Sequence, residues 1–210
     1  MTDKAEQKNK YLRKPVQQRS IDRKARLLDA AFAIFCEKGY YKTTTNEIAA
    51  RAQVSIGSLY SYFKDKDTIF FEILDRYHNK FDLAKTGLLN DPKFFRRDIK
   101  NWLRLLIINL INAHEETKEL NREITVLSYH NPKVAQIVEH NRAINMKATI
   151  EFFIQFKDDF KVKDPEASIK VMYDLLSATV DRIVFKENEI EPDRLIQVAI
   201  DAVYKYFFEL

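Results

Sequence analysis

The sequence has few of the residues that interrupt helices or cross-link chains: of its 210 residues, three are glycine, five are proline and one is cysteine. Sparse glycine favours helices over turn-rich sheets, and a single cysteine, Cys36, excludes an intramolecular disulfide. No apolar run approaches the roughly 20 residues that span a bilayer, and the N-terminus MTDKAEQKNKYLRKPVQQRS lacks the apolar segment of a secretory signal. We therefore expect a cytoplasmic protein with no membrane partner.

The residue patterns of common enzyme and metal sites are also lacking. The three glycines are too scattered for a phosphate-binding loop, and the cysteine has no obvious catalytic base in its segment. The histidines lack the helical pair spacing of a metal site, because the nearest two, His130 and His140, are ten residues apart. We expect no enzyme, no metal and no cofactor; an all-helical enzyme that uses His114 with Glu115 and Glu116 is a weaker alternative.

Charge is distributed unevenly along the chain, whose formal net charge at pH 7 is +4. Residues 1–66 hold 14 lysines and arginines against 7 aspartates and glutamates, a net charge of +7, whereas residues 67–210 hold 21 against 24, a net charge of −3. A basic end beside a weakly acidic remainder is typical of a protein of which one end meets a polyanion. A solvated basic tail without a partner is the alternative.

The spacing of apolar residues predicts an all-α fold. From Ser20 onward they recur at helical intervals, and the alternation of a strand persists nowhere. The first of four N-terminal helices ends near Gly39, a residue usual at a C-cap. Five further helices are expected between proline and polar breaks, over 93–113, 116–129, 132–158, 166–186 and 192–208. About nine helices are therefore predicted.

Two short helices joined by a tight turn form the most specific local pattern. Thr44 and Glu47 fit a capping box that opens the first of them, and Ser55 is a good N-cap for the second, which we expect to run to about Tyr62. A turn of about three residues separates them. This spacing predicts a helix-turn-helix motif.

The second of these helices, in the stretch SIGSLYSYFKDK, has the composition of a helix that enters the major groove of DNA. Small residues at its N-terminal end, Ser55, Gly57 and Ser58, let the backbone approach the bases. The hydroxyls of two tyrosines and the ammonium of a lysine, at positions 60, 62 and 66, can then reach phosphates. Together with the basic N-terminus, this composition favours DNA binding over a purely structural role.

TTTNEIAARAQVSIGSLYSYFKDKDTIF, residues 43–70, resembles the DNA-binding signature of the TetR family of bacterial transcriptional regulators. The resemblance covers about residues 20–81, and the chain length and all-α remainder agree with it. The polar and basic residues 1–19 are expected to form a flexible arm. The resemblance implies a helix-turn-helix domain at 20–66 and a helical ligand-binding and dimerisation domain at 67–210. It also implies DNA contacts from nine positions: Thr45, Asn46, Ser55, Ile56, Gly57, Ser58, Tyr60, Tyr62 and Lys66. Gln53 departs from the glycine that the family commonly has in the turn, and a positive φ there would cost about 1 kcal/mol.

The last two predicted helices are candidates for a dimer interface. Their apolar stripes are broader than one core contact needs, which suggests packing on the core from one side and on a partner from the other. The resemblance implies a four-helix bundle built from these two helices of each subunit. The expected dimerisation residues are Met172, Leu176, Val180, Ile183, Leu195, Ala199, Ala202 and Tyr206. A large monomeric core is the alternative.

The middle helices, which the family uses to hold a small-molecule effector, mix bulky apolar and aromatic residues with a few polar ones, as pockets do. Candidate ligand contacts are Trp102, Leu106, Tyr129, Asn141, Phe152, Phe156 and Tyr173. Aromatic residues at helical spacing also make plain core. A ligand for such a pocket would be hydrophobic or amphipathic.

These features together predict a ligand-responsive, sequence-specific transcriptional regulator. We expect a repressor that binds a palindromic operator in double-stranded DNA as a homodimer and is released by a small effector molecule, although a corepressor would reverse the response. The alternative is an architectural or nonspecific DNA-binding protein without a ligand, which would draw most of its affinity from the basic arm.

Overall fold

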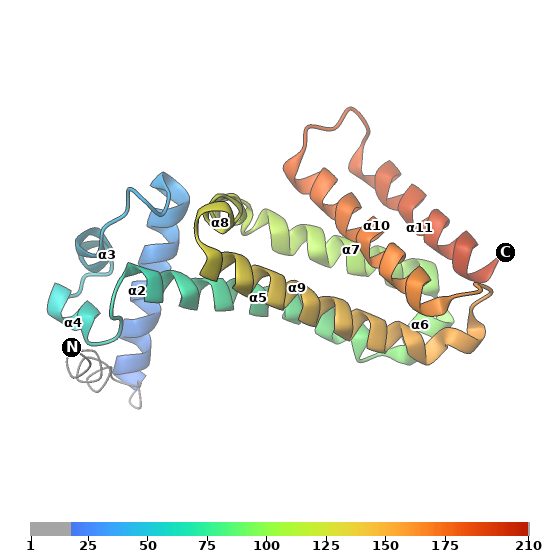
Figure 1. Ribbon diagram of the computed structural model, residues 1–210, viewed down its shortest axis with the longest axis horizontal. Coiled ribbons are helices and arrows are strands. Elements are labelled where there is room, and N and C mark those ends of the chain that lie inside the picture. The colour runs from blue at the N-terminus through green and yellow to red at the C-terminus, as the bar shows by residue number, and fades with distance from the viewer. Residues whose placement is uncertain (1–17, 210) are drawn as a thin grey trace. The chain divides into compact units, whose positions relative to one another are not determined.

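The structure, a computed structural model, describes residues 18–209, so most of the predicted arm at 1–19 lies outside the described residues. The all-α prediction is confirmed: residues 18–209 form ten α-helices and one 3-10 helix, and contain no strand. The N-terminal helices are α2 (Gln18–Lys38), α3 (Thr45–Arg51), α4 (Ile56–Tyr60) and α5 (Lys66–Leu89) (Figure 1). The others are α6 (Pro92–Arg97), α7 (Ile99–Glu115), α8 (Lys118–His130), α9 (Pro132–Phe153), the 3-10 helix Ile154–Asp159, α10 (Pro165–Phe185) and α11 (Pro192–Phe208).

The predicted helix at 93–113 is two helices, α6 and α7, which accounts for the additional α-helix. Asp98 separates them, because its φ of −153° and ψ of 77° are outside the helical region. Its side chain accepts a hydrogen bond from the Asn101 N–H at 3.1 Å, which caps α7. The predicted helix at 132–158 likewise ends as an α-helix at Phe153 and continues as the 3-10 helix.

The described chain forms two compact units, and each takes residues from two separate segments. Unit 1 contains residues 18–77 and Glu119–His130, and unit 2 contains residues 78–118 and 131–209. α5 supplies residues to both units. The predicted boundary between the DNA-binding domain and the ligand-binding domain, at residues 66 and 67, differs from this division into compact units and stays a prediction.

The core of unit 2 is built around Trp102 of α7, which is fully buried. Its ring stacks on Phe152 with 5.1 Å between centroids and meets Phe95 edge-on at 5.3 Å. Its Nε1–H donates to the Leu88 carbonyl oxygen at 3.1 Å, so the one polar atom of the indole is satisfied. α11 packs on α7 and α10 around this centre, and α10 also packs on α7 and α9.

Candidate DNA-binding site

α3 begins at a capping box, as the sequence predicts. The Thr44 hydroxyl accepts the Glu47 N–H at 3.3 Å, and the Glu47 carboxylate accepts the Thr44 N–H at 2.9 Å. The preceding loop starts at Gly39, whose φ of 83° lies in the left-handed region that favours glycine. A Cβ at Gly39 would also lie 3.1 Å from Oε2 of Glu123 in α8, which accepts the Tyr40 N–H. The positive φ therefore favours glycine at position 39, and the Glu123 carboxylate leaves little room for a Cβ.

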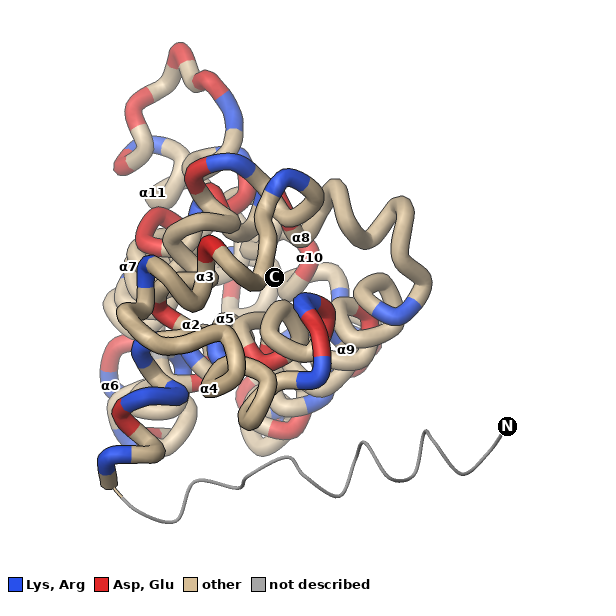
Figure 2. Tube along the Cα trace, turned by 90° about the vertical axis from the view of Figure 1, so that its left-hand side faces the viewer, with Lys and Arg blue, Asp and Glu red and all other residues tan. Residues whose placement is uncertain are grey.

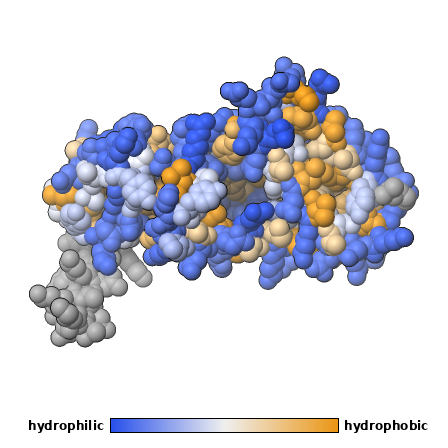
Figure 3. All heavy atoms as spheres, turned by 45° about the horizontal axis from the view of Figure 1, so that its top comes forward, coloured by the Kyte–Doolittle hydropathy of each residue, from blue (hydrophilic) through white to orange (hydrophobic). Residues whose placement is uncertain are grey.

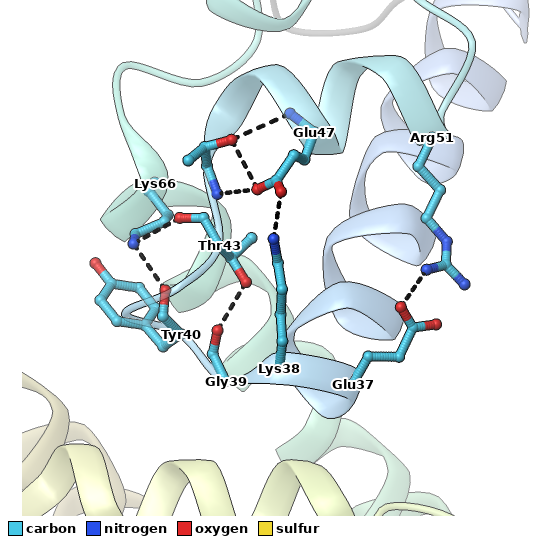
Figure 4. A network of polar contacts seen from close by, with 9 residues as sticks. Glu37, Lys38, Gly39, Tyr40, Thr43, Glu47, Arg51 and Lys66 are labelled. Carbon is cyan, nitrogen blue, oxygen red and sulfur yellow. Dashed lines mark hydrogen bonds and ion pairs between the residues drawn. The ribbon is translucent and has the colours of Figure 1, made fainter.

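Figure 4 shows the polar network that holds the same loop and α3 in place. The Lys66 ammonium donates to the carbonyl oxygens of Tyr40 at 2.7 Å and Thr43 at 2.9 Å, and it lies over the Tyr40 ring. Lys38 forms an ion pair with Glu47, the residue of the capping box. Several bonds thus fix the start of α3 relative to the end of α2 and the start of α5.

The turn from α3 to α4 is tight, and Gln53 occupies its special position. Gln53 has a φ of 56°, so the positive φ considered from the sequence is present. Its N–H donates to the Ala50 carbonyl oxygen at 3.0 Å, and the Val54 N–H donates to that of Ala49 at 3.0 Å. Ser55 then caps α4 by accepting the Ser58 N–H at 3.2 Å. The predicted cap is confirmed, and α4 ends at Tyr60 rather than near residue 62.

α4 has one buried and one exposed side. Leu59 and the following Phe63 are fully buried, which anchors the helix on unit 1. Ser55, Ile56, Gly57 and Tyr60 are exposed. Nothing lies within 4 Å of a Cβ built on Gly57, and the Tyr60 hydroxyl shares a hydrogen bond of 3.0 Å with that of Thr45 on α3. The exposed side therefore joins α3 and α4 into one surface of small and hydroxyl-bearing residues, hereafter the α3–α4 surface; Asn46 is also exposed on α3 and Ser58 is half-buried.

Two residues expected on this surface are placed differently. Tyr62 is buried, with 6% of its surface exposed, and its hydroxyl shares a hydrogen bond of 2.8 Å with Ser20 of α2. Lys66 is half-buried and directs its ammonium to the loop carbonyls described above. The expectation that both side chains point outward is wrong. Each has a hydrogen-bond partner that lies outside residues 55–66, so the pattern of that segment alone could not reveal it.

The charge near α4 comes from flanking residues. None of the residues of α4 is charged, and its tube is tan throughout in Figure 2. Lys42 before α3 and Lys64 after α4 are exposed, and Tyr41 is 63% exposed. Lys42, Lys64 and Tyr41 are not among the DNA contacts predicted from the sequence. A lysine on either side of a helix-turn-helix does, however, indicate phosphate contact.

The expected ligand residues differ in burial and in the unit to which they belong. Trp102, Leu106, Phe152 and Phe156 are buried in the core of unit 2, whereas Asn141 and Tyr173 are half-buried in the same unit. Tyr129 belongs to unit 1 and is 82% exposed. Trp102, Leu106, Phe152 and Phe156 fill the core of unit 2 with their own contacts.

The expected dimerisation residues divide into two groups. Met172, Leu176, Val180 and Ala199 are buried in the core of unit 2, so they pack on helices of their own chain. Ile183 and Leu195 are half-buried, and Ala202 and Tyr206 are exposed. The broad stripes serve the core first, because α10 and α11 pack on each other and on α7.

The described helices include none that is long and apolar enough to cross a membrane. A capped pair of short helices, joined by a tight turn and carrying an exposed surface of small and hydroxyl-bearing residues, defines a helix-turn-helix protein.

Comparison with known proteins identifies the family. Residues 27–73 match the model of bacterial regulatory proteins of the tetR family, and residues 86–205 match the model of a tetracyclin repressor-like C-terminal domain. The chain therefore belongs to the TetR family of bacterial transcriptional regulators, and it is not an enzyme.

Among its relatives, the HTH-type transcriptional regulator HbdR of Aromatoleum sp. (strain CIB) is 31% identical over 116 residues, which are 53% of this chain and 45% of HbdR. Similar folds occur in a TetR-family regulator from Mesorhizobium loti (TM-score 0.72, 21% identity, 91% of this chain and 100% of that chain) and in SmeT in complex with triclosan (TM-score 0.65, 19% identity, 89% of this chain and 92% of that chain). SmeT is the repressor of a multidrug efflux pump of Stenotrophomonas maltophilia.

Proposed function

We propose that the chain is a repressor that binds a palindromic operator through the α3–α4 surface and is released by a small molecule. The observation that carries the proposal is the uncharged, exposed side of α4, with Gly57 open at its N-terminal end and Tyr60 beside Thr45. Small and hydroxyl-bearing residues suit the edges of bases, while the flanking Lys42 and Lys64 suit phosphates. The proposed DNA contacts are Thr45, Asn46, Ser55, Ile56, Gly57, Ser58 and Tyr60, with Tyr62 and Lys66 as supporting residues behind them.

Reading a palindrome requires two copies of the chain. Apolar residues remain exposed on α10 and α11, among them Val171 (67%), Leu175 (41%) and Val198 (68%), and orange residues gather in the right half of Figure 3, where these helices lie. Val171, Leu175 and the exposed Ala178 share one face of α10, and Val198, Ala202 and Tyr206 share one face of α11. We propose that these residues form the dimer interface, in place of the buried ones.

Response to a ligand requires two forms of the protein with different DNA affinity, and a ligand with different affinity for each form. α5 starts beside the α3–α4 surface, where Lys66 and Tyr40 meet, and its later residues belong to unit 2. A ligand in unit 2 would act through α5 and change the separation of the two α4 helices in a dimer. The complex of SmeT with triclosan supports a small molecule as effector.

Selection of bound sequences from a random DNA pool tests the proposal. We expect a palindromic sequence that the protein prefers over random DNA by about 10³ or more. The variant Gly57→Glu should lose at least about tenfold in operator affinity and keep its melting temperature, because the added carboxylate faces open space in the protein and phosphates in the complex. An architectural protein would show no enriched sequence, and that result would reject the proposal.

A further inference from the structure

Unit 2 has a hollow of about 500 Å³ between α5 and α7. The volume lies within the usual range of small-molecule sites. Leu83 of α5, which is 76% exposed, supplies apolar surface, and the buried Leu88 and Ala113 line the hollow behind it. The amides of Asn109 and Asn112 from α7 add polar groups. A few polar groups on an apolar wall are suited to an amphipathic molecule.

Gly87, which also lines the hollow, is a helix residue that the fold itself does not require. It lies inside α5, where glycine is less favourable than alanine by about 1 kcal/mol. The φ of Gly87 is not positive, and nothing lies within 4 Å of a Cβ built on it. What the glycine does provide is bare backbone and additional room in the hollow. A local cost without a packing reason is expected at functional positions.

The charged groups of the hollow decide which ligand suits it. The Lys80 ammonium of α5 forms an ion pair with the Glu116 carboxylate, and their side chains are 38% and 64% exposed. Glu116 is the C-cap of α7, where unpaired carbonyl oxygens and the helix dipole favour positive charge. The hollow therefore already holds one ammonium at its acidic end. An exposed pair of this kind is weak enough for a ligand to replace.

We propose that this hollow binds a small amphipathic organic cation. Its charged group replaces the Lys80 ammonium at Glu116, and its apolar body covers Leu83, Gly87 and Leu88. The inference rests on the proposed function for its biological role, because it names the class of effector and its place in unit 2. The binding itself is measurable without DNA.

The experiment uses three probes with the same eight-carbon chain: octylammonium, octanol and octanoate. Calorimetric titration of the full chain should show the tightest binding for octylammonium and the weakest for octanoate. Glu116→Gln should weaken octylammonium binding by about tenfold, whereas Lys80→Gln should strengthen it by removing the internal competitor. Gly87→Leu should abolish binding of octylammonium and octanol alike, because its side chain fills the hollow.

Two controls separate the site from general effects. Glu115→Gln removes the neighbouring carboxylate of α7, which pairs with Lys118 and does not line the hollow, and it should leave the affinity unchanged. Gly87→Leu should not lower the melting temperature, because its side chain enters open space. Tightest binding of octanoate, or unchanged octylammonium binding in Gly87→Leu, would overturn the inference. Operator release is measured separately. If the protein binds octylammonium but keeps its operator affinity, the binding site is supported and the proposed release from DNA by this ligand is rejected.

Discussion

The chain has two regions rich in aromatic residues, and they differ in whether an aromatic side chain stays exposed. Around α4, Tyr60 stays 49% exposed although it follows the fully buried Leu59. In unit 2, Trp102 and Phe152 are buried and stacked on each other. The first region keeps Tyr62 and Phe63 buried and leaves the Tyr60 side chain exposed beside Thr45, whereas the second satisfies its single indole N–H internally through Leu88.

Composition alone therefore does not separate a binding surface from a core. α4 is a short helix with an N-cap and an open Gly57, so one side has no neighbouring helix to cover it. α7 is a long helix that packs on both α10 and α11. An aromatic residue next to buried ones therefore stays exposed in one setting, as Tyr60 does, and joins the core in the other, as Trp102 does.

Replacing Trp102 by alanine gives the largest expected effect. The change removes a fully buried indole and leaves a cavity among Phe95, Phe152 and Phe153, which should lower the free energy of unfolding by about 3–5 kcal/mol. Denaturant unfolding measures this loss. Tyr129→Ala is the matched control, because the 82% exposed side chain should change stability by less than about 0.5 kcal/mol. Equal effects would show that Trp102 is not a core residue.

Features that depend on a few consecutive residues could be predicted from the sequence. The capping box at Thr44, the cap at Ser55, the left-handed Gly39 and the positive φ of Gln53 each depend on a few consecutive residues, and all are present. Most of the helices also follow from local periodicity. The α3–α4 surface was largely predictable for the same reason, since its residues lie within one short segment.

Contacts between segments that are far apart in the sequence could not be predicted from local patterns. Tyr62 is buried because Ser20, 42 residues away, shares a hydrogen bond with its hydroxyl. Met172 and its neighbours turn inward because α7 and α11 cover them, which a stripe on α10 alone cannot show. The hollow beside Gly87 depends on how α5 and α7 pack, so no pattern in either helix predicts it.

Removing the hydroxyl of either Tyr60 or Tyr62 separates an effect on stability from an effect on DNA binding within one segment. Tyr62→Phe breaks the buried bond to Ser20 and should lower stability by about 1 kcal/mol, with operator affinity nearly unchanged. Tyr60→Phe removes an exposed hydroxyl and should weaken operator binding by about fivefold, with stability nearly unchanged. Thermal unfolding and operator titration of both variants measure the two effects. The reverse assignment of effects would contradict the proposed orientation of α4.

His114 brings a titratable group into the aromatic packing of unit 2. Its ring lies 4.4 Å from that of Phe81 and 5.5 Å from that of Phe185, and among the described residues its buried Nδ1 has no hydrogen-bond partner. Burial lowers the pKa of His114 from 6.5 to about 4. Between these values the unfolded state binds a proton that the folded state does not, so stability should fall as the pH decreases from 6.5 to 4.

His114→Phe keeps an aromatic ring and removes the titration. The slope of unfolding free energy against pH, measured between pH 4 and 6.5, should be smaller in the variant, by less than about 1.4 kcal/mol per pH unit because the ring is only partly buried. Groups such as Glu123, whose pKa burial raises, titrate equally in both proteins and cancel in the difference. Parallel slopes would show that His114 takes up its proton in the folded protein as readily as in the unfolded one.

The smallest expected effect concerns Gln53, where the helix-turn-helix carries a strain that the core of unit 2 does not. A non-glycine residue at a φ of 56° costs about 1 kcal/mol, and glycine would remove that cost while adding freedom to the unfolded chain. Gln53→Gly should therefore raise stability by up to about 1 kcal/mol. Gln53→Ala keeps the strain and should give no gain, so the difference between the two variants isolates the backbone term. Loss of stability in Gln53→Gly would mean that the glutamine side chain itself stabilises the turn between α3 and α4. The arrangement of the α3–α4 surface would then depend on a side-chain contact in addition to the backbone.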